Sequence, residues 1–170
     1  MYPLIRVGGA LLRARRAPRL GPGEVHVERT RCWPWDVDPF LELNNGRTMT
    51  LMDMGRLPLF ARTGLIDVLR REGWRLTLAG AAVRYRRRVP TFAAMEIRSR
   101  PLGRDARFLY LEQLVLARGA PAHHAIYRAA VVAEGIVPTD RLAAADPGTV
   151  WDAPPPAWAA AWAAAEAERP

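Results

Sequence analysis

One long helical stretch followed by four extended stretches is the sequence feature that most limits the folds open to this chain. Between Asn45 and Arg62, apolar residues recur every three or four positions, which is the period of a helix with one buried face. Thr63 and Gly64 form a C-terminal stop, after which residues 65–71 predict a shorter helix. Turn-forming residues then separate four predicted antiparallel strands, at residues 75–89, 93–102, 107–117 and 123–133.

Two elements are expected before the long helix. Residues 1–18 place apolar side chains at roughly helical spacing with arginines among them, which predicts a short amphipathic helix. Residues 24–32 alternate apolar and polar side chains, which predicts a strand. The order strand, long helix and four strands in a meander indicates an α+β fold, with the helix on a five-stranded antiparallel sheet. An exposed strand edge remains, so we expect a homodimer or a dimer of dimers joined through sheet edges.

The length of 170 residues fits one main domain. We expect a basic helical segment at residues 1–22, the main domain at 23–137 and a Pro-, Ala- and Trp-rich extension at 138–170. Trp158 and Trp162 lie one helical turn apart in that extension, which predicts a terminal helix packed on the body. No apolar run reaches the ~18 to 20 residues that cross a bilayer, and no cleavable leader is evident, so a cytoplasmic protein is expected.

All 25 basic residues are arginines, against 17 acids, for a formal net charge of +8. This balance favours anionic partners, although GC-rich coding accounts equally well for the arginine bias. The arginines are scattered and no stacking-aromatic motif accompanies them, so nucleic acid is the least favoured partner. The N-terminal helix has two interpretations: weak peripheral contact with an anionic membrane, or packing on its own domain. One cysteine excludes an internal disulfide, and the one serine, Ser99, lies outside any nucleophile elbow.

The segment between the first strand and the long helix carries the chemistry. Asp38 ends the extended segment, while Asn44 and Asn45 stand where a helix needs side chains to satisfy its first N–H groups. Asp38 is a candidate general base or nucleophile, with helix-start amides near Asn45 and Gly46 as oxyanion donors. The alternative is that these are ordinary turn and capping residues. Asp36 would share a face with Asp38 in an extended backbone, where repulsion would raise one pKa.

This segment resembles the signature of the 4-hydroxybenzoyl-CoA thioesterase branch of the hotdog-fold superfamily, in a bacterial thioesterase-like subgroup. That signature reads Asp-x-Asp, a spacer with Gly-His, Asn-Asn and then an aromatic residue. The positions that match it in this chain are Asp36, Asp38, Asn44 and Asn45. The positions that depart from it are Leu41 for the glycine, Glu42 for the histidine and Thr48 near the aromatic.

The resemblance implies a hotdog fold, a long helix wrapped by a curved antiparallel sheet, with two sheets joined and two active sites shared across a dimer. It implies acyl-CoA thioester hydrolysis with Asp38 as the catalytic carboxylate and no cofactor. Asp53, on the long helix, is a fallback carboxylate because other hotdog branches carry theirs there. The alternative is a catalytically weak or inactive hotdog protein that binds acyl-CoA or lipid.

The expected substrate contacts come from segments before and after the long helix in the sequence. Phe40 is expected to line the acyl pocket. Arg84, Arg86 and Arg88 would share one face of a strand by its two-residue period, with Arg87 opposite, and Arg86 and Arg88 are the candidates for coenzyme A phosphates. A solvated strand face is the alternative. No metal site is expected, since His123 and His124 would point to opposite faces of their strand and the acids Asp36, Asp38 and Glu42 lack calcium-loop spacing.

Overall fold

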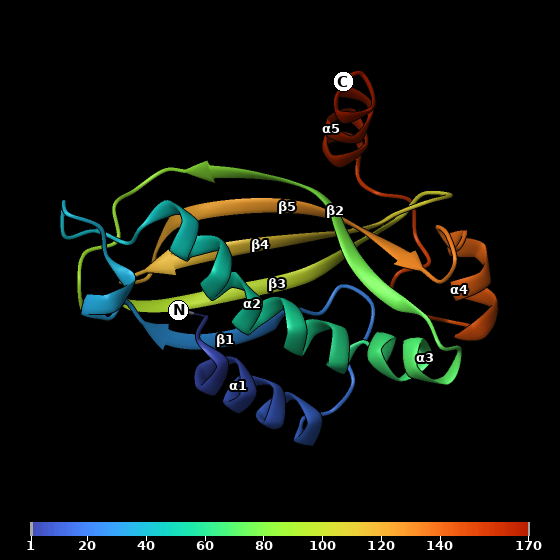
Figure 1. Ribbon diagram of the computed structural model, residues 1–170, viewed down its shortest axis with the longest axis horizontal. Coiled ribbons are helices and arrows are strands. Elements are labelled where there is room, and N and C mark those ends of the chain that lie inside the picture. Colours follow the sequence, from blue (N-terminus) through green and yellow to red (C-terminus); the bar gives the residue numbers. More distant parts are fainter. Residues whose placement is uncertain (1, 170) are drawn as a thin grey trace.

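The computed structural model describes residues 2–169, and a five-stranded antiparallel sheet forms their centre. In spatial order the strands run β1-β3-β4-β5-β2. Their bounds are β1 His26–Arg31, β2 Arg75–Tyr85, β3 Ala94–Arg104, β4 Leu109–Ala117 and β5 Ala120–Val132. The long helix α2, Asn45–Arg62, crosses one face of the sheet (Figure 1). The predicted α+β architecture is confirmed.

The predicted four-strand meander is wrong in one respect. Only β3, β4 and β5 form a meander, while β2 lies at the far edge and pairs with β5, with Tyr85 opposite His123. The physical reason is that β1 already occupies the free edge of β3, with His26 opposite Ser99. The chain therefore enters β2 on the opposite edge of the sheet and returns to the sheet interior through residues 86–93.

Local sequence signals placed the helices well. The predicted spans of α2 and of α3, Leu65–Arg71, match the structure, and Gly64 at the junction adopts φ +78°, a left-handed conformation that favours glycine. The N-terminal helix α1 covers Leu4–Arg16, and a single 3-10 turn, η1, covers Pro34–Asp36. Two further helices follow the sheet: α4, Thr139–Ala145, and α5, Ala157–Ala167.

The core lies between α2 and the sheet. Leu51, Met52 and Leu59 of α2 are fully buried there. Gly55 sets how closely the helix approaches the sheet, since a Cβ atom at that position would lie 2.5 Å from Ser99 Oγ and 2.9 Å from Ile97 Cγ2. A larger residue would therefore push α2 away from the sheet.

The helix α1 packs on its own domain. Val7, Ala10 and Ala14 are buried, and small alanines allow the two helices α1 and α2 to approach closely. This confirms one of the two interpretations of the N-terminal segment. The face of α1 that packs on the domain is the one that carries Val7, Ala10 and Ala14.

The C-terminal extension also packs on the body. Arg104 of β3 bonds Asp140 at 2.6 Å and Asp152 at 2.7 Å, and the Trp151 side chain is fully buried. Trp162 of α5 meets Tyr110 edge to face, with ring centroids 6.5 Å apart. The predicted terminal helix packed on the body is confirmed.

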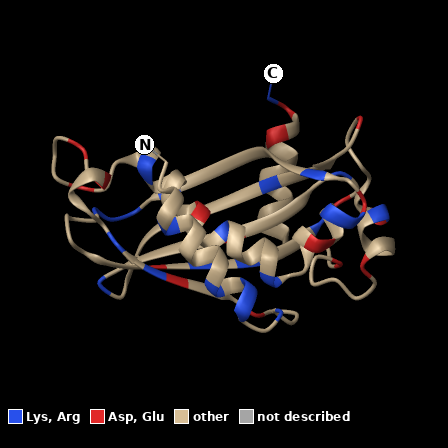
Figure 2. Ribbon diagram, turned by 60° about the horizontal axis from the view of Figure 1, so that its bottom comes forward, with Lys and Arg blue, Asp and Glu red and all other residues tan. Residues whose placement is uncertain are grey.

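Charged residues are spread over many elements of the ribbon (Figure 2). Basic residues occur on helices, strands and loops around the molecule (Figure 2). Within residues 2–169, no helix combines the length and the apolar character needed to cross a bilayer.

The buried His26 predicts a loss of stability in acid. Burial lowers the pKa of His26 to about 4, and the charges of Arg62 and Arg13 act in the same direction. Between this value and the ordinary pKa of about 6.5, His26 binds a proton in the unfolded chain but stays neutral in the folded protein. The free energy of unfolding therefore falls as pH drops below ~6.5. We expect a loss of about 2 kcal/mol between pH 7 and pH 5 from this group. Urea denaturation of wild type and His26→Gln at both pH values measures it, and parallel losses in the two proteins would contradict it.

Candidate active site

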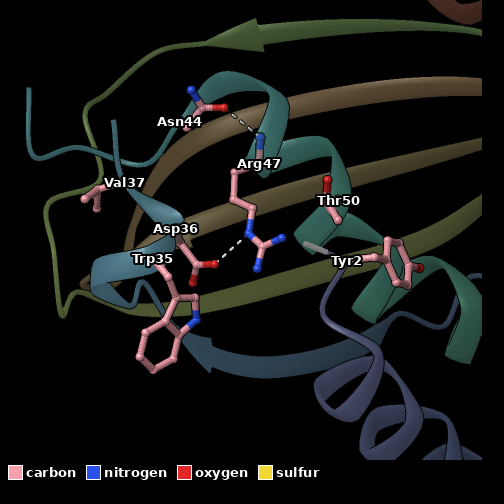
Figure 3. A pocket seen from close by; sticks show the side chains of 7 residues that line it. All are labelled: Tyr2, Trp35, Asp36, Val37, Asn44, Arg47 and Thr50. Carbon is pink, nitrogen blue, oxygen red and sulfur yellow. Dashed lines mark hydrogen bonds and ion pairs between the residues drawn. The ribbon is translucent and has the colours of Figure 1, made fainter. Parts of the chain in front are cut away.

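A buried ion-pair cluster centred on Asp36 organises the start of α2. Asp36 is 1% exposed, and its two carboxylate oxygens accept hydrogen bonds from Arg6 Nη1 of α1 and Arg47 Nε of α2, each at 2.7 Å. The Trp33 amide donates a third bond, at 3.1 Å. Figure 3 shows Arg47 reaching from α2 toward Asp36, below which the Trp35 ring lies at the edge of the site.

The electrostatics of Asp36 differ from the sequence expectation. Burial raises the pKa of the Asp36 carboxyl, but the hydrogen bonds from Arg47, Arg6 and the Trp33 amide outweigh burial and hold the pKa below its ordinary value. The expected repulsion between Asp36 and Asp38 is therefore not what sets this pKa. Asp36 is ionised and acts as a structural anchor between three elements.

Asp38 stabilises a tight turn just before α2. Its Oδ1 accepts a hydrogen bond from the Phe40 amide at 2.9 Å, and its carbonyl oxygen accepts one from the Leu41 amide at 3.0 Å. The Asp38 amide in turn donates to the Glu42 carbonyl at 2.9 Å. Asp38 thus closes a small hairpin whose base is the bridge between Val37 and Leu43.

Leu41 occupies the turn position where the family signature has glycine, and it adopts the backbone conformation that glycine prefers. Its φ is +59°, in the left-handed region, and its side chain is 69% exposed. A leucine there carries strain that glycine would avoid. Thr91 Oγ1 donates a hydrogen bond to the Leu41 carbonyl at 3.2 Å, and the next residue, Phe92, also has a positive φ, of +62°.

The N-terminus of α2 is built as the sequence predicts. Asn44 is the N-cap, and its Oδ1 accepts a hydrogen bond from the Arg47 amide at 3.0 Å. Asn45 and Gly46 follow in the exposed first turn, and no described residue accepts a hydrogen bond from their backbone amides. These two N–H groups stand at the positive end of the helix dipole, where negative charge is favoured.

The arginine row lies beside this position, but not on a strand. β2 ends at Tyr85, so Arg86, Arg87 and Arg88 belong to an irregular segment, and the predicted alternation of faces does not apply. The Arg86 and Arg87 amides both donate to the Ala122 carbonyl, at 2.8 and 3.1 Å. All three arginines line one hollow of about 260 Å³, whereas Arg84 does not.

Sequence reasoning missed three residues that also line this hollow: Glu42, Tyr85 and His123. Glu42 Oε2 lies 3.0 Å from Arg88 Nε, and the Glu42 side chain is about a quarter exposed. Tyr85 Oη donates to the Asn45 carbonyl at 3.1 Å. Asp38 does not line the hollow, so the carboxylate that faces it is Glu42. The one sequence feature that pointed to Glu42 as a site residue was its position between Asp38 and the pair Asn44 and Asn45.

His123 ties the arginine segment to α2. Its Nδ1 lies 3.3 Å from Thr48 Oγ1 and its Nε2 lies 3.2 Å from the Arg87 carbonyl oxygen. Burial lowers the pKa of His123, so the ring is neutral at pH 7. His124 points to the other face and pairs with Glu112 at 2.6 Å, as strand alternation predicts. Among the residues described, no three His, Cys, Asp or Glu side chains gather as metal ligands.

Two further candidates lie apart from the hollow. The Phe40 side chain is 79% exposed at the tip of the turn. Asp53, the fallback carboxylate, is engaged on both oxygens: it pairs with Arg56 and accepts a hydrogen bond from Tyr2 Oη at 2.9 Å. Neither residue lines the hollow at the α2 N-terminus.

Comparison with protein families assigns the chain. The model of the thioesterase-like superfamily matches residues 32–162, which include the whole α2 N-terminal region. The chain belongs to this superfamily.

Two curated relatives of this thioesterase-like protein are each named Protein THEM6. The one from Xenopus laevis is 34% identical over 84 residues, covering 49% of this chain and 41% of the relative. The one from Drosophila melanogaster is 34% identical over 83 residues, covering 48% and 43%. The chain thus spans about two-fifths of these relatives' lengths.

Solved structures share the hotdog fold with this thioesterase-like protein. The probable thioesterase YbaW from Escherichia coli superposes with a TM-score of 0.67 at 12% identity, covering 74% of this chain and 98% of that one. A thioesterase from Thermus thermophilus, solved with coenzyme A and Zn, gives a TM-score of 0.56 at 23% identity, covering 69% and 93%. At these identities the likeness establishes the fold.

The strain at Leu41 predicts that its replacement by glycine stabilises the protein. Leu41→Gly removes the penalty that a Cβ atom carries in the left-handed region, and it gives up little buried surface because the side chain is 69% exposed. We therefore expect the free energy of unfolding to rise by about 0.5–1 kcal/mol. Leu41→Ala is the matched control, because it removes the same exposed side chain and keeps the penalty. Urea denaturation compares the three proteins. Equal stabilisation by glycine and alanine would show that the side chain, and not the backbone, carries the strain.

Proposed function

We propose that this protein hydrolyses an acyl-CoA thioester to a free acid and coenzyme A at the N-terminus of α2. The observation that carries the proposal is the meeting of three groups at one hollow: the Glu42 carboxylate of the preceding turn, Asn45 in the first turn of α2, and the arginine segment 86–88. Asp38 lies in the same turn as Glu42, and its amide donates to the Glu42 carbonyl. The Thermus thermophilus thioesterase solved with coenzyme A supports this substrate class. We also propose that the chain belongs to the 4-hydroxybenzoyl-CoA thioesterase branch.

In the proposed reaction Asp38 acts as general base or nucleophile. As a base, it takes a proton from water, whose oxygen attacks the thioester carbonyl carbon. The carbonyl oxygen becomes an oxyanion, which the Asn45 and Gly46 amides stabilise, with Asn44 holding the helix start in place. Collapse breaks the C–S bond, the proton passes to the departing thiolate, and the acid is released. This scheme needs no metal or redox cofactor.

The remaining substrate contacts follow from the surface around the hollow. Arg86 and Arg88 face it and are proposed to bind the phosphates of coenzyme A, since guanidinium groups form paired hydrogen bonds with phosphate oxygens. Phe40, exposed at the turn tip, is proposed to contact the acyl group.

We propose that two copies pair through their β2 strands. β2 is an eleven-residue edge strand with no charged residue between Arg75 and Arg84, and Leu78 on it is 42% exposed. The opposite edge strand, β1, carries Glu28, Arg29 and Arg31, which discourage pairing. Joining the β2 edges would satisfy their backbone groups and bring a second copy beside the site.

A binding protein of low activity is the second candidate function. Two observations favour it: Leu41 and Glu42 replace the glycine and histidine of the signature, and one Asp38 oxygen is already engaged in the turn. Release of free thiol from short, long and aromatic acyl-CoAs separates the two functions. Binding measured by calorimetry without thiol release would establish the binder.

Asp38→Asn tests the proposed catalytic carboxylate. Asparagine keeps the Oδ1 atom that closes the turn and removes the base, so kcat should fall by about 100-fold or more while the thermal midpoint stays near that of wild type. Steady-state thiol release and thermal denaturation measure the two quantities.

Glu42→Gln and Asp53→Asn are the companion variants. If Asp38 is the base, both retain most of the wild-type kcat. Full activity in Asp38→Asn would refute its role, and the variant that then loses activity would identify the carboxylate, either Glu42 at the hollow or Asp53 on α2.

Replacing Arg86 and Arg88 together by glutamine tests phosphate binding. Phosphate contacts are equally strong in the ground and transition states, so KM for acyl-CoA should rise by about tenfold, or ~1.4 kcal/mol, while kcat stays nearly constant. Arg84→Gln is the matched control, because Arg84 is exposed but does not line the hollow. A KM equal to that of the control would leave these arginines as a solvated surface.

A further inference from the structure

The outward face of α1 exposes large apolar side chains to solvent. Val7, Ala10 and Ala14 face α2 and are buried. On other sides of the helix, Leu4 is 71% exposed and Ile5 93% exposed. Leu12, two turns after Ile5, is 52% exposed. The helix is therefore apolar on two faces, of which the domain covers one.

The charges of α1 are all positive. The helix contains four arginines and no acidic residue. Arg6 and Arg13 turn toward the domain, where they pair with Asp36 and Glu28. Arg15 and Arg16 are exposed, and neither forms an ion pair with any residue in the described part of the chain. Two cations thus remain at the C-terminal end of the exposed apolar side chains.

An exposed tryptophan and a hollow continue this surface onto η1. Trp35 is 68% exposed and stacks on Trp33, with ring centroids 5.6 Å apart. A hollow of about 690 Å³ lies between η1 and the first turn of α1. The residues that line it are Tyr2, Pro3, Leu4, Ile5, Arg6, Trp35 and Arg47. The apolar surface is therefore continuous across two elements.

We propose that this surface binds the headgroup region of an anionic lipid bilayer, with α1 lying in the plane of the interface. The residues of this lipid-binding face are Leu4, Ile5, Leu12, Arg15, Arg16 and Trp35. Apolar side chains enter the acyl boundary, arginines bond lipid phosphates and tryptophan favours the headgroup level, so each residue type matches one layer of the interface.

Charge complementarity selects the bilayer over a second copy. Because the face carries cations and no acid, two copies packed face to face would bring like charges together. The apolar side chains of this face can be buried in a bilayer, which arginines alone cannot provide. This property distinguishes the face from the rest of the basic surface. The proposal does not depend on thioester hydrolysis, since none of its residues lines the hollow at the α2 N-terminus.

Vesicle co-sedimentation tests the proposal with the full chain. Wild type should bind vesicles of phosphatidylcholine containing about one-third phosphatidylglycerol and should bind pure phosphatidylcholine poorly. Its binding to the anionic vesicles should weaken in about 0.5 M salt. The double variant Ile5→Ser with Leu12→Ser keeps every charge and should lose about tenfold in affinity. Ile136→Ser, which removes an equally apolar side chain that is 42% exposed elsewhere, is the matched control and should bind like wild type.

Thermal denaturation and light scattering accompany the binding assay. Both serine variants should keep the wild-type midpoint and mass, because the replaced side chains are exposed. Wild-type binding by the double variant would overturn the proposal and leave only general attraction by net charge. A smaller mass for the double variant would also overturn it, since the face would then join copies of the chain. Failure of wild type to bind anionic vesicles would overturn it directly.

Discussion

The ion pairs of Asp36 with Arg6 and Arg47 hold together the parts of the structure on which the site depends. One carboxylate receives 2.7 Å hydrogen bonds from α1 and from α2, and a backbone bond from Trp33 beside η1. A charge that is 1% exposed is costly to bury unless it is paired in this way. Arg47 is also bonded through its backbone to the Asn44 cap, so the same anchor fixes the α2 N-terminus. Amides held rigidly there can stabilise a developing charge without reorganising.

The same anchor gives α1 its two faces. Arg6 fixes the first turn of α1 to η1, and Val7, Ala10 and Ala14 pack on α2. With those contacts made, the helix cannot rotate to bury Ile5 or Leu12. Exposed apolar surface therefore follows from the ion pair and the buried face together, and it lies next to Trp35 of the same cluster.

Local signals were sufficient for much of this architecture. The spans of α2 and α3 follow from apolar periodicity, an Asn cap and Gly64 in a left-handed stop, all of which act within a few residues. The turn at Asp38 is likewise local, since its bonds reach only as far as Glu42. Each of these features has its cause within one helical turn or one hairpin of sequence.

Long-range contacts determined the remainder. β2 pairs with β5 because β1 occupies the free edge of β3. The arginines after Tyr85 leave the strand because His123 bonds their segment to α2, through Thr48, which lies 75 residues before His123 in the sequence. Asp36 and Asp38 look alike in sequence, and only the position of Arg6, 30 residues away, makes one of them a buried anchor. Pairings across such separations depend on how whole elements pack, so no local pattern of residue types encodes them.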